Sequence, residues 1–189
     1  YRDLASGGVA LITTSYASVS KKGQALANML SFGDGADEEG LKKLSGTVHD
    51  EGAKIMAQLV HAGSNRMFDP GFPAEGPSAV PHRMSQVTPV QMSADDISQV
   101  IKDYAVAAAR AVEYGYDAVQ IHAAHEYLLS SFLSPFSNNR TDQYGGSIEN
   151  RARLLFEVYR AVRDVVGNDY PVTVKINIRD FYDDGITAD

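Results

Sequence analysis

Two histidines and a tyrosine stand close together in the middle of the chain, at His122, His125 and Tyr127. They follow an apolar run at residues 117–121 that has the composition of a buried β-strand. An imidazole can donate a hydrogen bond to a substrate oxygen, and a phenol that stays protonated at neutral pH can act as a general acid. Side chains of this kind at a strand end are typical of the active sites of α/β enzymes.

The same residues allow other interpretations. A histidine pair three residues apart can bind zinc or iron, but no third ligand is clearly spaced with His122 and His125. A single histidine often has only a structural role, and a tyrosine such as Tyr127 more often packs than donates a proton. The chemistry therefore depends on the elements that position these side chains.

Apolar runs and amphipathic stretches alternate along the chain. Four short apolar runs predict buried strands, at residues 9–14, 54–60, 117–121 and 172–178. Three amphipathic stretches predict helices, at residues 38–51, 93–115 and 147–167. Residues 61–92 hold five of the seven prolines and predict a long loop. This alternation predicts an α/β fold with parallel strands and right-handed crossovers.

Polar residues stand at the carboxyl ends of the expected strands, which favours a barrel over an open doubly wound sheet. These residues are Ser15, Gln58, His61, His122 and Lys175. No glycine-rich dinucleotide or phosphate-loop motif follows a strand. A complete (β/α)8 barrel needs eight strands and about 250 residues. The simplest interpretation of this 189-residue chain is half of a barrel. Because the first residue is Tyr1 rather than Met and residues 187–189 lie where another helix should begin, we expect both ends to be truncated.

The composition is that of an ordinary soluble protein, with 44% hydrophobic and 22% charged residues. A formal net charge of -7 disfavours nucleic acid and anionic membranes as partners. The chain has no cysteine, so it can form neither a disulfide nor a thiolate ligand. No membrane-spanning run or signal peptide is visible in the sequence, and we expect a cytoplasmic protein.

Several motifs resemble those of the Old Yellow Enzyme family, in the family's order and over nearly the whole chain. They are Gly7-Gly8-Val9, Gln58-Leu-x-His61-x-Gly63, His122-Ala-Ala-His125-x-Tyr127-Leu-Leu, Phe132-Leu-Ser-Pro135, Asn139-Arg-Thr-Asp142-x-Tyr144-Gly-Gly-Ser147 and Glu149-Asn-Arg151. Members of this family are FMN-dependent NAD(P)H:flavin oxidoreductases and ene-reductases with a TIM-barrel fold. The resemblance implies that residues 1–189 are part of an FMN-binding TIM-barrel domain and cover barrel strands two to five.

The resemblance also implies a role for each site residue. His122 and His125 would bind the carbonyl or phenolate oxygen of a substrate above the flavin, and Tyr127 would protonate the α-carbon. The implied substrate is an enone or a related small molecule, and NADH or NADPH would supply the hydride. No metal is expected, whereas assembly as a homo-oligomer is possible.

Four further residues are implied to hold the flavin. Gln58 would contact its pyrimidine edge, and Lys175 would pair with the anionic reduced form. Most members carry Arg at the position of Lys175. Ser15 and Tyr16 fall where the family's second strand meets the flavin.

The chain departs from the family's pattern at two further positions. Glu126 stands where Gly is usual, so it either alters the local backbone or points to solvent, and Ser64 replaces the usual Arg. Two other functions stay open, a non-catalytic half-barrel without flavin and a metal-dependent barrel hydrolase. Of the remaining polar residues, His49 and His82 are expected at the surface and His61 in loop stabilisation. Asp142 and Arg151 are expected to form structural ion pairs.

Overall fold

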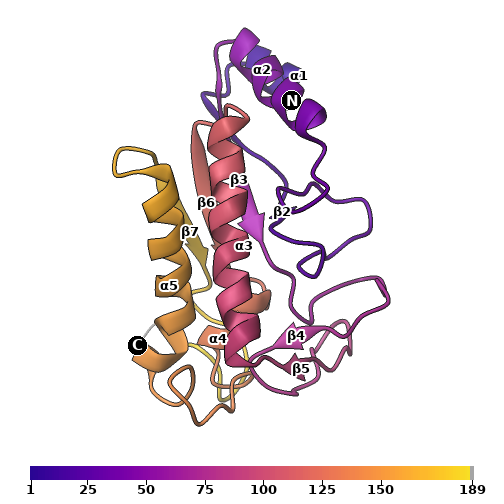
Figure 1. Ribbon diagram of the computed structural model, residues 1–189, viewed down its shortest axis with the longest axis vertical. Helices are drawn as coiled ribbons and strands as arrows, with labels where there is room; N and C mark the ends of the chain where they lie inside the picture. The colour runs from indigo at the N-terminus through magenta and orange to yellow at the C-terminus, as the bar shows by residue number, and fades with distance from the viewer. Residues whose placement is uncertain (188–189) are drawn as a thin grey trace.

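A parallel β-sheet lies at the centre of the computed structural model, which describes residues 1–187 (Figure 1). Its strands follow the chain in the order β1 (Leu11–Thr13), β3 (Lys54–Val60), β6 (Ala118–Ala123) and β7 (Val172–Ile176), while β2 (Ala17–Ser18) also pairs with β3. All of these pairings are parallel. The predicted α/β fold with a parallel half-barrel sheet is therefore confirmed. The expected helix start at residues 187–189 falls mostly outside the described residues.

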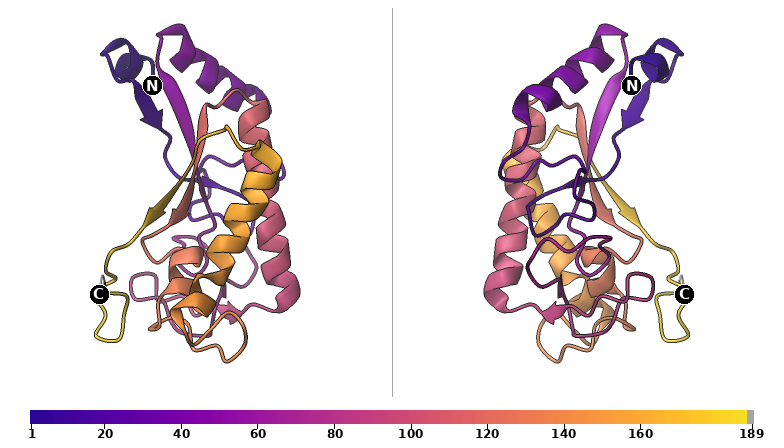
Figure 2. Two further views of the ribbon diagram at one scale, coloured as in Figure 1. Left: turned by 90° about the vertical axis from the view of Figure 1, so that its left-hand side faces the viewer. Right: turned by 90° about the vertical axis from the view of Figure 1, so that its right-hand side faces the viewer.

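Five helices accompany the sheet among residues 1–187. They are α1 (Arg2–Ser6), α2 (Glu38–Asp50), α3 (Ala94–Glu113), α4 (Leu128–Leu133) and α5 (Ile148–Val166). The two long helices, α3 and α5, pack side by side along one face of the sheet (Figure 2). The three helices predicted from sequence are confirmed, whereas α1 and α4 are too short to show a helical period in the sequence.

Local sequence signals explain where α3 starts and stops. Ser93 forms a capping box with Asp96: the Asp96 N–H donates to Ser93 Oγ at 3.2 Å, and the Ser93 N–H donates to Asp96 Oδ2 at 2.9 Å. Gly115 follows the helix with φ +79°, a conformation that glycine adopts without strain. Four residues, 114–117, then separate α3 from β6 (Ala118–Ala123), the strand that carries His122.

The core lies between the sheet and the two long helices. Alternate residues of β3 and β6 face these helices and are fully buried: Ile55, Ala57, Leu59, Val119 and Ile121. The helices contribute the buried side chains Val100, Tyr104, Ala108, Leu154, Val158 and Val162. Because side chains alternate along a strand, Gln58, Gln120 and His122 point to the opposite face. Packing of the apolar residues against the helices therefore determines which polar residues lie on the inner face of the half-barrel.

The predicted loop at residues 61–92 contains a small parallel pairing of β4 (Glu75–Gly76) with β5 (Val90–Gln91). Arg140 holds this loop from the segment after α4. Its guanidinium donates to the carbonyls of Pro77 and Met92 and forms a 2.6 Å ion pair with Asp142. The structural ion pair predicted for Asp142 is confirmed. The one predicted for Arg151 is wrong, because that side chain donates to the carbonyls of Leu133 and Gly146.

A search of the described residues for a helix long and apolar enough to cross a membrane found none.

One buried hydrogen bond joins the core to the loop after β3. Tyr104 is fully buried, and its hydroxyl accepts from the His61 backbone N–H at 3.0 Å. We expect Tyr104→Phe to reduce the free energy of unfolding by about 1–3 kcal/mol, because the His61 N–H loses its partner. Urea denaturation would measure this. Tyr159→Phe is a matched control, since Tyr159 is half-buried and its hydroxyl has no partner within residues 1–187; equal stability losses in both variants would contradict the assignment.

Candidate active site

Four aromatic side chains meet at the carboxyl end of β6. The ring centroid of His122 lies 5.0 Å from that of His125 and 5.0 Å from that of Tyr127. The Tyr127 ring is in turn 5.5 Å from the ring of Tyr16, which comes from the segment between β1 and β2. The structure therefore brings together four of the seven residues that the sequence predicts for the site.

His122 is a neutral hydrogen-bond donor in this setting. It is buried, and its Nδ1 accepts a hydrogen bond from the backbone N–H of Ala124 at 3.2 Å. With Nδ1 as the acceptor, the proton of a neutral ring is on Nε2. Burial, together with the charge of Lys175 and the neighbouring His125, lowers the pKa of His122 to about 3. At neutral pH the ring can donate through Nε2 without carrying a charge.

His125 is held through its backbone. Its φ angle is +60°, its N–H donates to Asn177 Oδ1 at 3.2 Å, and its carbonyl accepts from Asn65 Nδ2 at 2.9 Å. Partial desolvation and the charge of Lys175 lower the pKa of His125 below its ordinary value. Two amide side chains that sequence reasoning missed thus fix this ring's position. The signal for Asn177 was present, since it stands two residues after Lys175 on the same strand face.

Tyr127 is suited to hold a proton rather than release it to solvent. Burial and the neighbouring Tyr16 hydroxyl raise the pKa of Tyr127 above its ordinary value. The residue precedes α4, whose six residues are all buried, so its backbone is fixed by packing. A protonated phenol in this position can act as a general acid.

A row of polar side chains crosses the inner face of the sheet. Gln58 on β3 stands in register with Gln120 on β6, which stands in register with Thr173 on β7. Gln58 Nε2 donates to Gln120 Oε1 at 2.6 Å, and Gln120 Nε2 donates to Thr173 Oγ1 at 3.2 Å. Gln120 and Thr173 were missed from sequence, although the alternation with His122 could have shown that Gln120 shares its face.

Lys175 lies beside the histidine pair. It is half-buried, stands in register with His122, and has no ion-pair partner within residues 1–187. Amide side chains both donate and accept hydrogen bonds, as the polar edge of a flavin requires. A cation without a carboxylate partner suits the negative charge of a reduced flavin. Gln58 and Lys175 therefore fit FMN. Ser15 receives no such support, because it is exposed and its hydroxyl contacts no partner among the described residues.

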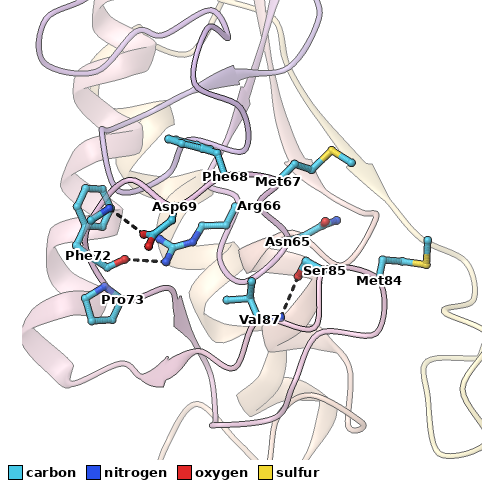
Figure 3. A pocket seen from close by; sticks show the side chains of 11 residues that line it. Asn65, Arg66, Met67, Phe68, Asp69, Phe72, Pro73, Met84, Ser85 and Val87 are labelled. Carbon is cyan, nitrogen blue, oxygen red and sulfur yellow. Dashed lines mark hydrogen bonds between the residues drawn. The ribbon is translucent and has the colours of Figure 1, made fainter.

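One cavity near the site lies in the loop at residues 61–92 rather than over the sheet. It has a volume of about 940 Å³ and is bordered by Asn65, Arg66, Phe68, Phe72 and Met84 (Figure 3). Its border includes none of the predicted site residues. Asn65 connects the two regions through its hydrogen bond to the His125 carbonyl.

A metal site gains no support from the geometry. Within residues 1–187, no group of three or more His, Asp or Glu side chains is placed to hold a metal ion. The second nitrogen of His122 accepts a backbone N–H, so only one nitrogen of that ring faces the site.

Two histidines outside the pair can now be assigned. His61 is buried, and its Nδ1 accepts from the Gly63 N–H at 3.2 Å, which confirms the predicted loop-stabilising role. The expectation that His82 lies at the surface is wrong. It is 6% exposed, and its Nε2 is 2.9 Å from Glu126 Oε2, although the N–H is not well directed along that line. Glu126 therefore does not point freely to solvent.

Comparison with known proteins identifies the family. The model of the NADH:flavin oxidoreductase / NADH oxidase family matches residues 1–189. The chain belongs to this family. The predicted resemblance to the Old Yellow Enzyme family is thereby confirmed, and with it FMN and a nicotinamide coenzyme as the family's groups.

Individual relatives agree with the family assignment. The chain is 40% identical over 186 residues to an NADPH dehydrogenase of Bacillus subtilis, which covers 98% of the chain and 54% of that protein. It is 40% identical over 182 residues to a metal reductase of Desulforamulus reducens, covering 96% of the chain and 27% of that protein. The chain thus spans about half the length of the first relative and about a quarter of the second.

Solved structures of family members share the fold. A complex of morphinone reductase with tetrahydroNAD superposes with a TM-score of 0.83 at 31% identity, covering 92% of this chain and 54% of that one. A complex of 2-naphthoyl-CoA reductase gives a TM-score of 0.90 at 30% identity, covering 98% of this chain and 30% of that one. The chain thus spans about half of the first of these structures and less than a third of the second.

Two buried histidines predict a pH dependence of stability. The pKa values of His61 and His122 are lowered to about 3, and desolvation is the main cause for both. Between this pKa of the folded state and the pKa of about 6.5 in the unfolded chain, the unfolded chain binds more protons than the folded protein. We expect stability to be greatest above about pH 6.5 and to decrease as the pH falls, by on the order of 1 kcal/mol per pH unit for each ring.

Denaturation at pH 7 and pH 5 would measure this effect, and His122→Gln should make the pH dependence shallower. Nitrogen NMR should show the Nε2–H tautomer of His122 throughout this range. A doubly protonated His122 ring at pH 5 would contradict the neutral assignment.

Proposed function

We propose that this protein is an FMN-dependent oxidoreductase that uses NAD(P)H to reduce the activated C=C bond of α,β-unsaturated carbonyl compounds. The observation that carries the proposal is the convergence of a neutral histidine pair and a protonated tyrosine next to Lys175, which has no ion-pair partner among residues 1–187. Residues 1–189 would be part of the FMN-binding TIM-barrel domain. We extend the proposal to a cytoplasmic location, a small-molecule substrate and possible assembly as a homo-oligomer.

The histidine pair would bind and polarise the substrate carbonyl. FMN, when bound, supplies the two-electron chemistry between the nicotinamide and the alkene. Negative charge develops on the carbonyl oxygen during this reduction, and the N–H groups of His122 and His125 would stabilise it. Their lowered pKa values support this role, because neutral rings keep their donor protons without losing them to the growing oxyanion.

Tyr127 would complete the reaction by donating its phenolic proton to the α-carbon. Its raised pKa keeps the proton in place until the carbon becomes basic. Lys175 would hold negative charge on the flavin beside the histidines, and Gln58, Gln120 and Tyr16 would shape the surface on which the cofactor lies.

The direct test uses the product of the longest reading frame that encodes this chain. Its visible spectrum should show bound flavin that bleaches when NADH or NADPH is added without oxygen and returns when an enone is added. A protein that takes up no FMN would instead favour a non-catalytic half-barrel. If NAD(P)H bleaches the flavin but no enone restores its colour, only the flavin-reduction half of the proposal would stand.

We expect His122→Ala to slow reduction of an enone by about 10²-fold, which is the usual effect of removing one oxyanion donor. Phenol binding should weaken in parallel, while flavin reduction by NAD(P)H changes little. Stopped-flow absorbance separates the two half-reactions. His49→Ala, on α2 and outside the site, is the control. Equal losses in both half-reactions would argue against carbonyl binding by His122.

We expect Tyr127→Phe to slow enone reduction by about 10²-fold or more, because the phenyl ring keeps the packing but has no proton to donate. FMN should remain bound with an unchanged spectrum. Tyr170→Phe is the control, because it also removes a tyrosine hydroxyl, one that donates to the Tyr116 carbonyl outside the site. Normal turnover in Tyr127→Phe would exclude Tyr127 as the acid.

A further inference from the structure

Glu126 has a backbone conformation that side chains rarely adopt. Its φ angle is +58°, and it directly follows His125 with φ +60°. Two consecutive non-glycine residues in the left-handed region are strained, since the Cβ atom approaches the next carbonyl. Glycine, which has no Cβ atom, adopts this conformation without strain. Glu126 therefore occupies a position that disfavours a side chain.

The Glu126 carboxylate is bound from two sides. Its Oε2 accepts from the Tyr182 hydroxyl at 2.9 Å and lies 2.9 Å from Nε2 of the buried His82. These contacts hold the pKa of Glu126 below its ordinary value, with the His82 contact as the largest cause. His82, Glu126 and Tyr182 are called the Glu126 cluster below.

Each member of the Glu126 cluster comes from a different segment. His82 belongs to the loop at residues 61–92, Glu126 to the end of β6, and Tyr182 to the segment after β7. Tyr182 also stacks on Phe136 at 3.7 Å between ring centroids. The carboxylate contacts both His82 and Tyr182, so it joins the two loops to the end of β6, next to the histidine pair. The Arg83 guanidinium, 5.6 Å from the centroid of the Tyr182 ring, is a second contact between the same two loops.

The His82 side of the cluster extends through Ser85 to the backbone of Ser64. His82 Nδ1 accepts from the Ser85 N–H at 3.1 Å, and the Ser85 hydroxyl donates to the Ser64 carbonyl at 2.8 Å. Ser64 and Glu126 also border the same buried pocket. The contact between His82 and Glu126 is therefore continuous, through Ser85, with the start of the loop at residues 61–92.

The cluster also borders a cavity next to His125. Glu126, His82, His125 and Asn177 line one cavity of about 240 Å³. Asn177 and Asn65, which hold the His125 backbone, belong to the same two segments that the carboxylate ties down. A movement of either segment would displace His125 and change the walls of this cavity.

We propose that Glu126 is a positioning residue that sets substrate affinity by tying the loop at residues 61–92 and the segment after β7 to the end of β6. This role rests on the proposed function for its substrate, but the contact between the segments exists without cofactor. The alternative is that Glu126 is a tolerated surface substitution whose contacts have no consequence for the site.

Glu126→Gly separates these possibilities, because glycine removes both the carboxylate and the backbone strain. If the carboxylate positions the loops, hydrogen exchange of residues 82–86 and 179–185 should become faster in Glu126→Gly even though the strain is relieved. The KM for an enone should rise by about tenfold, as expected for loss of a charged hydrogen bond, with kcat changed less than about twofold. Unchanged exchange and unchanged KM would overturn the proposal.

Two further variants test the contacts themselves. Glu126→Gln keeps the shape and the strain but removes the charge, and it should give an intermediate KM. Tyr182→Phe should raise the KM. The double variant with Glu126→Gly should have a KM little higher than that of Glu126→Gly alone, because both changes break the same hydrogen bond. Fully additive effects would show that Tyr182 and Glu126 act separately and would also overturn the proposal.

Glu51→Gln is the matched control, since it removes a glutamate bound to Arg2 on the opposite side of the fold from the cluster. It should leave exchange and KM unchanged. Failure of the proposed function would appear as a lack of FMN uptake or of enone turnover. The hydrogen-exchange experiment needs neither FMN nor enone turnover, because it can be run on the flavin-free protein. Failure of the positioning role is therefore distinguishable from failure of the proposed function.

Discussion

The register of the parallel strands decides which chemistry the sheet can present. β6 pairs with β3 and β7 so that Gln58, Gln120 and Thr173 form one row and His122 stands beside Lys175. Because side chains alternate, a slip of one residue would turn Ile121 toward the site and His122 toward the helices. The buried side chains Val119 and Ile121 prevent this slip, since they pack under α3 and α5. The apolar face thus fixes the position of the polar one.

A second consequence of this register is the charge state of the site. Lys175 lies where its positive charge opposes protonation of His122 and His125, and desolvation acts in the same direction. The site therefore combines one cation with two uncharged donors. Such a set can bind an oxygen that becomes negative and a flavin that becomes anionic without the mutual repulsion that three cations would cause.

The sequence was sufficient for the parts of the structure that local rules govern. Apolar runs located β3, β6 and β7, and the caps Ser93 and Ser147 located the long helices, because these signals lie within one element. The motif around His122 located the candidate site. The burial of His82 against Glu126 could not be predicted, since it depends on three segments far apart in the chain meeting at one point. Arg151 was assigned to an ion pair, because composition does not show that nearby carbonyls compete for a guanidinium.

The end of β6 shows why the loops belong to the site as much as the strands do. His125 and Glu126 each adopt a left-handed conformation that costs on the order of 1 kcal/mol. Contacts from other segments offset these costs: Asn65 and Asn177 form hydrogen bonds with the His125 backbone, each of about 1 kcal/mol, and the Tyr182 hydroxyl donates to the Glu126 carboxylate, which also lies 2.9 Å from His82 Nε2. All four partners lie in the loop at residues 61–92 or in the segment after β7. The strand brings His122 into place by itself, whereas His125 reaches its position only when these two segments are ordered. Assembly of the histidine pair is therefore coupled to loop ordering, and a change in either loop can alter substrate binding without touching a catalytic side chain.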